Sequence, residues 1–228
     1  EPQAVVHCAW FTAHGAYWSS PENLDWTAAT LSLAREAHER GATRFVGVGT
    51  CAEYAWGGAE PLAETTPLQP TTLYGVAKDA ARRVLEAFAQ TSNLSWAWPR
   101  VAMLYGPGEY KDRFVASLAR ALVQGEPAKM SSGKAVRDVL DARDVGAAIA
   151  AVATSKLTGA VNIGSGHPVT LLQVGQTLAR LAGRPDLLRT GALPDRANEP
   201  MHLVMDVTRL TREAGFRPDR PAADRHVG

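Results

Sequence analysis

The sequence predicts an α/β fold of the doubly wound, parallel-sheet type. Short, apolar, β-branched runs alternate with helical patterns along the chain, and several of the joins between them are short. No internal repeat is present. A strand, a helix and a second strand joined in this way form a βαβ unit, in which the strands pair in parallel.

The first βαβ unit occupies the N-terminal fifty residues. Residues 4–9 are short and nearly all apolar, so we expect a strand buried on both faces. Pro21 and Glu22 predict a helix start, because proline suits the first helical position and an acid suits the first turn. Gly41 is placed to end that helix, and residues 44–49 form a second apolar run that predicts a buried strand.

Residues 54–71 are rich in proline and glycine, which predicts a long loop, and long ordered loops usually carry function. A helix over residues 72–90 and a strand over residues 94–104 are expected next. The remaining elements are a helix capped by Asp112 and running to Leu122, a strand over 136–140, a helix over 142–153, a strand over 161–163, a helix opened by a capping box of Thr170 and Gln173, and a strand and helix over 203–206 and 208–214. Asp144 and Asp206 are expected to cap helices.

Composition and charge exclude several classes of protein. The chain has 228 residues, of which 46% are hydrophobic, enough for one sizeable core. Its 24 basic and 23 acidic residues are interspersed and leave a net charge of +1, which argues against a nucleic-acid partner. The sequence has no apolar stretch of about 18 residues and no leader, so we expect no membrane span and a cytoplasmic location.

The cysteines and histidines predict no metal site. Cys8 and Cys51 lack the spacing of metal ligands and fit a reducing compartment, either as free thiols or joined in one bridge. The six histidines show no paired spacing.

Tyr74 and Lys78 are the most informative pair. Four residues apart on a helix, they lie on one face, and a cation beside a phenol lowers the pKa of the phenol. Tyr74 would then serve as a proton donor and acceptor, whereas the simpler interpretation is an exposed helix pair. Thr50 ends a predicted parallel strand, where open α/β sheets bind ligands, although its hydroxyl could instead bond its own turn.

Two further motifs accompany Thr50, Tyr74 and Lys78: Arg100 before the run Leu104 to Gly108, and the run Arg137 to Val145. Together the motifs resemble the extended short-chain dehydrogenase/reductases. This is the NAD-dependent epimerase/dehydratase family, which modifies nucleotide sugars. The resemblance extends from Val5 to about Pro218. It implies a Rossmann-like domain whose C-terminal part is residues 1–110, and a small α+β substrate-binding region in residues 111–228. It also implies a homodimer formed through helices 23–40 and 72–90.

The resemblance assigns roles to single residues. Thr50 would hydrogen-bond the sugar oxygen that is oxidised or reduced, and Tyr74 would move its proton. Lys78 would lower the pKa of Tyr74 and hold the nicotinamide ribose of NAD or NADP, with Ala9 also at the cofactor. For the substrate, the resemblance implies Arg137 and Arg196 at the diphosphate and Met103 near the sugar; a surface salt bridge is the simpler interpretation of each arginine.

Three features depart from the family pattern. Its phosphate-binding glycine loop lies on the first strand-to-helix turn, and this sequence begins near what would be the fourth strand. The G-x-G-x-x-A match at residues 47–52 is rejected as a dinucleotide fingerprint, because a loop rather than a helix follows it. Met103 replaces a substrate-contacting Asn. Cys51 and Ala52 stand where 4,6-dehydratases carry the Asp and Glu that catalyse water elimination.

The sequence therefore predicts an NAD(P)-dependent nucleotide-sugar epimerase or 4-ketoreductase. The chain as given is expected to bind NAD(H) weakly or not at all, and to expose one flank of its sheet. A catalytically silent binding or scaffold protein of the same fold is the alternative, and it is favoured if the natural chain starts at Glu1. A redox sensor of the NmrA-like type is less favoured, because such proteins commonly lack the Tyr and Lys pair.

Overall fold

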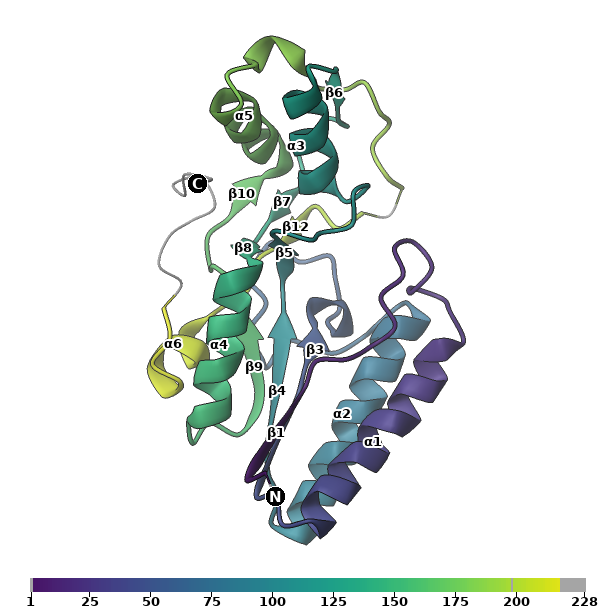
Figure 1. Ribbon diagram of the computed structural model, residues 1–228, viewed down its shortest axis with the longest axis vertical. Helices are drawn as coiled ribbons and strands as arrows, with labels where there is room; N and C mark the ends of the chain where they lie inside the picture. The colour runs from purple at the N-terminus through teal and green to yellow at the C-terminus, as the bar shows by residue number, and fades with distance from the viewer. Residues whose placement is uncertain (1, 198, 218–228) are drawn as a thin grey trace.

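The computed structural model describes residues 2–197 and 199–217. A parallel sheet lies between two sets of helices, and a smaller group of helices and short strands lies beyond one end of the sheet (Figure 1). The α/β class and the parallel sheet predicted from the sequence are confirmed.

The sheet contains five strands, β1 (Ala4–His7), β2 (Arg44–Gly47), β3 (Gly49–Thr50), β4 (Ser95–Val101) and β9 (Gly159–Ile163). β4 is central, with β2 and β3 on one side and β9 on the other. β2 and β3 pair with successive stretches of β4, so they form one strand that is interrupted at Val48. β1 pairs with β2 at the edge.

Helices α1 (Glu22–Glu39) and α2 (Leu73–Ser92) pack side by side over one face. Their apolar side chains enclose Phe45 and Trp98 of the sheet in one core. Gly41 follows α1 with a φ of 90°, so its predicted role at the end of the helix is confirmed. α2 begins after Thr72, whose side chain accepts a hydrogen bond from the Gly75 N–H at 3.2 Å.

Helices α4 (Ala142–Thr154) and α6 (Thr208–Glu213) cover the other face. Asp141 caps α4, because its side chain accepts from the Arg143 N–H at 2.8 Å. The prediction that Asp144 caps this helix is wrong, since Asp144 already lies in the first turn. Asp206 precedes α6 by two residues and accepts from the Thr208 N–H at 2.8 Å, although it is not the N-cap residue.

The smaller group contains two helices, α3 (Phe114–Gln124) and α5 (Leu171–Leu181), which enclose a separate small core around Leu118 and Met130. The predicted capping box of Thr170 and Gln173 is present at the start of α5. Asp112 does not cap α3, which begins after Arg113 without a side-chain cap. The short strands here are β5 (Met103–Tyr105), β6 (Ala128–Lys129), β7 (Val136–Arg137), β8 (Val139–Asp141), β10 (Val169–Thr170), β11 (Leu188–Arg189) and β12 (His202–Leu203).

The edge strand β1 differs from its prediction. The side chain of Val6 is 42% exposed, and Val5 and His7 are only half-buried, so the expectation of burial on both faces is wrong. Within the part of the chain that the structure describes, β1 pairs with β2 alone. The exposed flank that we predicted is therefore present.

The predicted loop over residues 54–71 is also confirmed. A short 3-10 helix, η1 (Cys51–Glu53), follows β3, and single bridges at Tyr54 and Leu62 are the β-structure assigned within the loop. None of the helices in residues 2–197 and 199–217 has the length and apolar character needed to cross a membrane.

Candidate active site

Thr50, Tyr74 and Lys78 come together at the carboxyl end of the sheet. Thr50 is the last residue of β3, Tyr74 lies in the first turn of α2, and Lys78 follows one turn later. Gly75 makes the approach possible, because a Cβ at this position would meet the carbonyl oxygen of Ala52 and the side chain of Pro70. The start of α2 is therefore held against η1, which directly follows Thr50.

The pKa of the Tyr74 phenol is subject to opposing effects. Burial raises the pKa of Tyr74 above its usual value of 10, while a hydrogen bond with the Thr50 side chain lowers it by less. The pKa of Tyr74 is also raised by the charges of Tyr17, Cys51 and Glu53. Desolvation of the phenol is the dominant effect, and the lowering of the Tyr74 pKa by Lys78 stays a prediction.

Lys78 is buried and already has partners. Its Nζ donates to the carbonyl oxygen of Val48 at 2.7 Å and lies 3.8 Å from the centre of the Trp10 ring. The interruption of the strand at Val48 leaves that carbonyl available. Burial lowers the pKa of Lys78 to about 7, opposed by the charges of Glu53 and Cys8.

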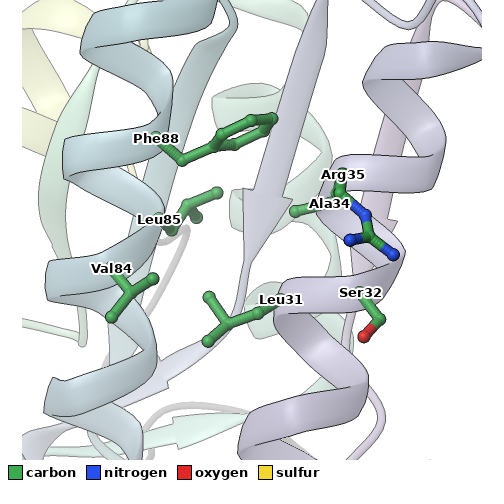
Figure 2. A pocket seen from close by; sticks show the side chains of 7 residues that line it. All are labelled: Leu31, Ser32, Ala34, Arg35, Val84, Leu85 and Phe88. Atoms are coloured by element: carbon green, nitrogen blue, oxygen red, sulfur yellow. The ribbon is translucent and has the colours of Figure 1, made fainter.

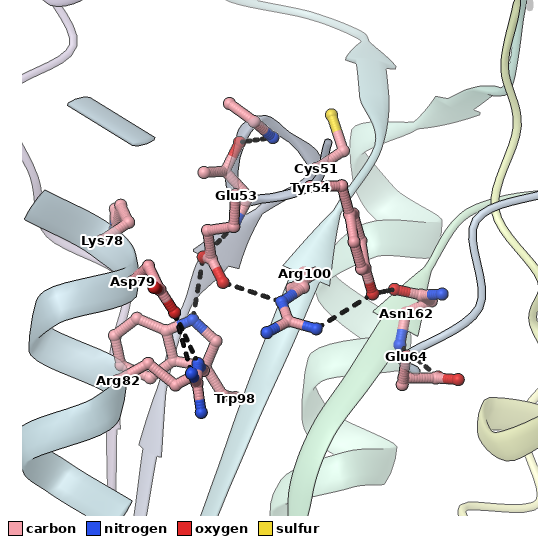
Figure 3. Close-up of polar contacts among 12 residues, drawn as sticks. Cys51, Glu53, Tyr54, Glu64, Lys78, Asp79, Arg82, Trp98, Arg100 and Asn162 are labelled. Carbon is pink, nitrogen blue, oxygen red and sulfur yellow. Dashed lines mark hydrogen bonds and ion pairs between the residues drawn. The ribbon is translucent and has the colours of Figure 1, made fainter. Parts of the chain in front are cut away.

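Glu53 anchors the turn that carries Thr50 (Figure 3). Its Oε1 accepts from the Thr50 N–H at 2.9 Å and from Trp98 Nε1 at 2.9 Å, and its Oε2 accepts from Arg100 Nε at 2.7 Å. The Glu53 side chain is 0% exposed and that of Arg100 2% exposed. The carboxylate is thus fully occupied by three donors from β3 and β4.

The same network continues toward the long loop (Figure 3). Arg100 donates to the Tyr54 hydroxyl at 3.0 Å, and that hydroxyl donates to Asn162 Oδ1 at 2.7 Å. Asn162 in turn donates to the carbonyl oxygen of Leu62 at 2.7 Å. The sequence analysis placed Arg100 in the family pattern but did not predict this network. The residues that form it come from segments far apart in the chain.

The arginines lie on the side of the smaller group. Arg137, in β7, is 5% exposed and donates to Glu199 at 2.7 Å and to the carbonyl oxygen of Val136 at 2.8 Å. Arg196 is exposed. Burial raises the pKa of Tyr17 to about 12, and the charges of Arg113 and Arg196 oppose this rise. Tyr17 itself packs edge-on against Tyr74, with ring centres 5.0 Å apart.

Arg113 and Tyr17 were missed by the sequence analysis, and so was Asp138. Asp138 is 0% exposed and accepts from the N–H groups of Ser165, Gly166 and Met205 at 2.6, 3.0 and 3.2 Å. It fixes the backbone beside Arg137 against the end of β9. Its position in the run that follows Arg137 is the signal that could have found it.

The other predicted residues are placed as follows. Ala9 is exposed directly after β1, and Met103 is half-buried in β5, where it pairs with Val139. Cys8 and Cys51 are free thiols, so there is no bridge between them. Across the described part of the chain, no group of three histidine, cysteine or acidic residues could hold a metal ion.

The packing agrees with the conclusion that the glycines of residues 47–52 are not a dinucleotide-binding motif. A Cβ at Gly47 or Gly49 would run into the Trp98 ring, so both glycines make room for a core indole. Neither begins a helix, because η1 and a loop follow.

The residues at this edge fit the nicotinamide end of a dinucleotide. A phenol and an ammonium converge beside a buried hydroxyl at the carboxyl end of parallel strands, where such folds bind ligands. The described turn between β1 and α1 contains one glycine, Gly15, and offers no glycine-rich cradle for the pyrophosphate.

The fold and the site define an α/β protein with a threonine, tyrosine and lysine site of the short-chain dehydrogenase/reductase type. The comparison with protein families specifies it further: residues 1–164 match the NAD dependent epimerase/dehydratase family. The chain belongs to this family.

Individual relatives agree with that assignment. The chain is 26% identical over 245 residues to a dTDP-glucose 4,6-dehydratase of Neisseria gonorrhoeae, covering 95% of this chain and 70% of the relative. It is 26% identical over 163 residues to a dTDP-L-rhamnose 4-epimerase of Burkholderia thailandensis, covering 68% of this chain and 44% of the relative. The crystal structure of a Thermus thermophilus UDP-glucose 4-epimerase complex with NAD matches with a TM-score of 0.84 and 25% identity, covering 97% of this chain and 74% of that one.

Proposed function

We propose that this chain carries the catalytic residues of an NAD-dependent enzyme that oxidises or reduces a nucleotide-diphosphate sugar, as a 4-epimerase or a 4-ketoreductase. The convergence of Thr50, Tyr74 and Lys78 at the carboxyl end of the sheet is the observation that carries the proposal. Relatives named as acting on dTDP sugars, and a matching epimerase with NAD, support the same substrate class and cofactor.

Bound NAD supplies the acceptor and donor of hydride at a sugar carbon. The residues of this chain handle the proton that accompanies it. Burial raises the pKa of Tyr74, so its phenol would donate a proton to the oxygen when a ketone is reduced and would become a phenolate. When an alcohol is oxidised, the phenolate form would take up the proton of that alcohol. Thr50 supplies a second hydroxyl to the same oxygen, which orients it and stabilises the negative charge that develops there.

Lys78 and Ala9 complete the proposed cofactor side. The Lys78 ammonium would donate to the nicotinamide ribose and place positive charge near Tyr74, and the exposed backbone at Ala9 would line the same edge. With a pKa of about 7, Lys78 is charged in part of the population at neutral pH.

The site does not support water elimination. Cys51 and Ala52 offer no carboxylate, and the neighbouring Glu53 uses both of its oxygens on buried donors. Burial also raises the pKa of the Cys51 thiol to about 12, so this thiol is a poor general base at neutral pH. We therefore place the reaction at oxidation and reduction, unlike the 4,6-dehydratases that the sequence matches.

Arg137 and Arg196 are proposed to bind the substrate diphosphate, together with Arg113. Guanidinium groups bond two phosphate oxygens at once and carry the opposite charge, so arginines are suited to hold a diphosphate. Arg137 pairs with Glu199 in this structure. To bind the diphosphate, the Arg137 guanidinium would have to leave Glu199 or contact both groups at once. Met103 lies in β5 within the same smaller group and is the proposed apolar neighbour of the sugar.

We also propose a homodimer formed by α1 and α2. An apolar groove runs between the two helices, lined by Leu31, Ser32, Ala34, Arg35, Val84, Leu85 and Phe88 (Figure 2). Val84 in the groove is 51% exposed, and Leu24 in the first turn of α1 is 61% exposed. Exposed apolar side chains that gather on one face are typical of an interface between subunits.

The proposed function is tested by replacing Tyr74 in protein expressed from its complete reading frame. Tyr74→Phe removes the proton donor and keeps the ring, so turnover of a dTDP- or UDP-4-keto sugar should fall by about 10²–10⁴-fold. Tyr110→Phe is the matched control, because Tyr110 is 49% exposed and stacks on His14. Turnover of Tyr74→Phe within about threefold of the parent would remove Tyr74 from this role, by the same comparison of rates.

A further inference from the structure

Lys78 lies over the face of an aromatic ring deep in the protein. Its Nζ is 3.8 Å from the centre of the Trp10 ring, and Lys78 and Trp10 are 4% and 8% exposed. A ring face carries negative potential and attracts an ammonium, most strongly where water is absent. Among the described residues, the Val48 carbonyl is the one hydrogen-bond acceptor of this ammonium, although an ammonium has three donors.

The Trp10 ring is itself fixed. Its Nε1 donates to Asn23 Oδ1 at 2.8 Å, and Asn23 is 0% exposed at the start of α1. The amide of Asn23 donates in turn to the carbonyl oxygens of Tyr17 and Ser20, each at 2.8 Å. One buried amide therefore orients the indole and also orders the loop that leads into α1.

We infer that Trp10, oriented by Asn23, is a positioning residue that keeps the Lys78 ammonium charged and in place beside Tyr74. The ring face substitutes for part of the water that burial removes from the ammonium. The ring of Trp10 also meets Tyr74 edge-on, with centres 6.5 Å apart, so one indole contacts both members of the pair. The relevance to catalysis rests on the proposed function, whereas the contact itself can be tested without it.

Other groups also act on Lys78. Glu53 in η1 and Cys8 after β1 raise the pKa of Lys78 through charge, and His7 in β1 has its own pKa lowered by Lys78 and by burial. Tyr74 shares the first turns of α2. A test must therefore alter the ring face of Trp10 and leave these groups unchanged.

Stepwise fluorination of one ring meets that requirement. Fluorine withdraws charge from the ring face with little change in size, so 5-fluoro-, 5,7-difluoro- and 5,6,7-trifluorotryptophan are introduced at position 10 alone. The pKa of Lys78 is measured by NMR titration of the lysine side-chain carbons, with Lys78→Met to assign the signal among the five lysines. We expect this pKa to fall with each fluorine, by about one pH unit in total.

The matched control is the same series at Trp26. This indole lies in the same aromatic group, 6.5 Å from Trp10 between ring centres, and stacks on His7. A graded fall at position 10 without one at position 26 supports the inference. A constant pKa through the series at position 10, or an equal fall at both positions, overturns it. Neither outcome depends on turnover, so failure here is distinct from failure of Tyr74→Phe.

Discussion

Replacement of Glu53 by alanine tests the anchoring of Thr50 in the most direct way. The change removes the acceptor of three donors, which are the backbone N–H of Thr50, the indole of Trp98 and the guanidinium of Arg100. Arg100, which is 1% exposed in the parent, keeps its charge, and the Tyr54 hydroxyl is the side-chain hydrogen-bond partner that it retains among the described residues. The variant therefore leaves a buried cation without its counter-charge.

The cost follows from that geometry. Removing one partner of a buried ion pair destabilises a protein by about 3–5 kcal/mol, because the remaining charge is not solvated. The two neutral donors that lose their acceptor add to the cost. We expect the free energy of unfolding to fall by at least about 3 kcal/mol, a large part of the stability of an ordinary domain.

Urea unfolding followed by far-UV circular dichroism measures this difference. Glu36→Ala is the control, because Glu36 pairs with Arg40 on the exposed surface of α1, where such a pair contributes about 0.3–0.5 kcal/mol. A loss for Glu53→Ala below about 1 kcal/mol, similar to the control, would refute the buried network as the anchor of this turn.

Two further predictions concern binding and assembly. Arg137→Ala should weaken the binding of UDP or dTDP by about 2–3 kcal/mol in isothermal titration, because a charge-assisted contact with the diphosphate is lost. Arg209→Ala is the control: it breaks an ion pair with Glu213 on α6 and should leave this affinity unchanged. Equal affinities for the parent, Arg137→Ala and Arg209→Ala would show that Arg137 has a structural role. Val84→Glu should convert a dimer to a monomer in light scattering, whereas Val123→Glu, at an 82% exposed position on α3, should not. A parent that is already monomeric contradicts the proposed interface.

Local patterns predicted much of the fold. The capping box at Thr170, the glycine at position 41 and the proline-rich loop are each encoded within a few residues, so the sequence was sufficient to place them. The helix caps assigned to Asp112 and Asp144 were wrong by one and three residues. Asp141 takes the cap that was assigned to Asp144, whereas α3 begins without a side-chain cap.

The sequence predicted that Tyr74 and Lys78 share one helix face, but not how far they are buried. A spacing of four places Tyr74 and Lys78 on one face, and this is what the structure has. The spacing says nothing about burial, which raises the pKa of Tyr74 and lowers that of Lys78. Glu53 follows Thr50 by three residues and forms a capping box with it, a local pattern that the sequence analysis did not use. The contacts of Glu53 with Trp98 and Arg100, and of Trp10 with Lys78, join distant segments, and no local pattern indicates them.

The central claim, that this site transfers hydride at a sugar carbon, is tested most directly by following deuterium. Protein from the complete reading frame is incubated with NADH or NADPH deuterated at C4 of the nicotinamide and with a dTDP- or UDP-4-keto sugar, and the product is analysed by mass spectrometry and NMR. We predict deuterium at C4 of the sugar with the parent protein, and its loss with Tyr74→Phe. A protein that binds the nucleotide sugar but transfers no deuterium from either cofactor would contradict the claim and favour a silent binding protein of this fold.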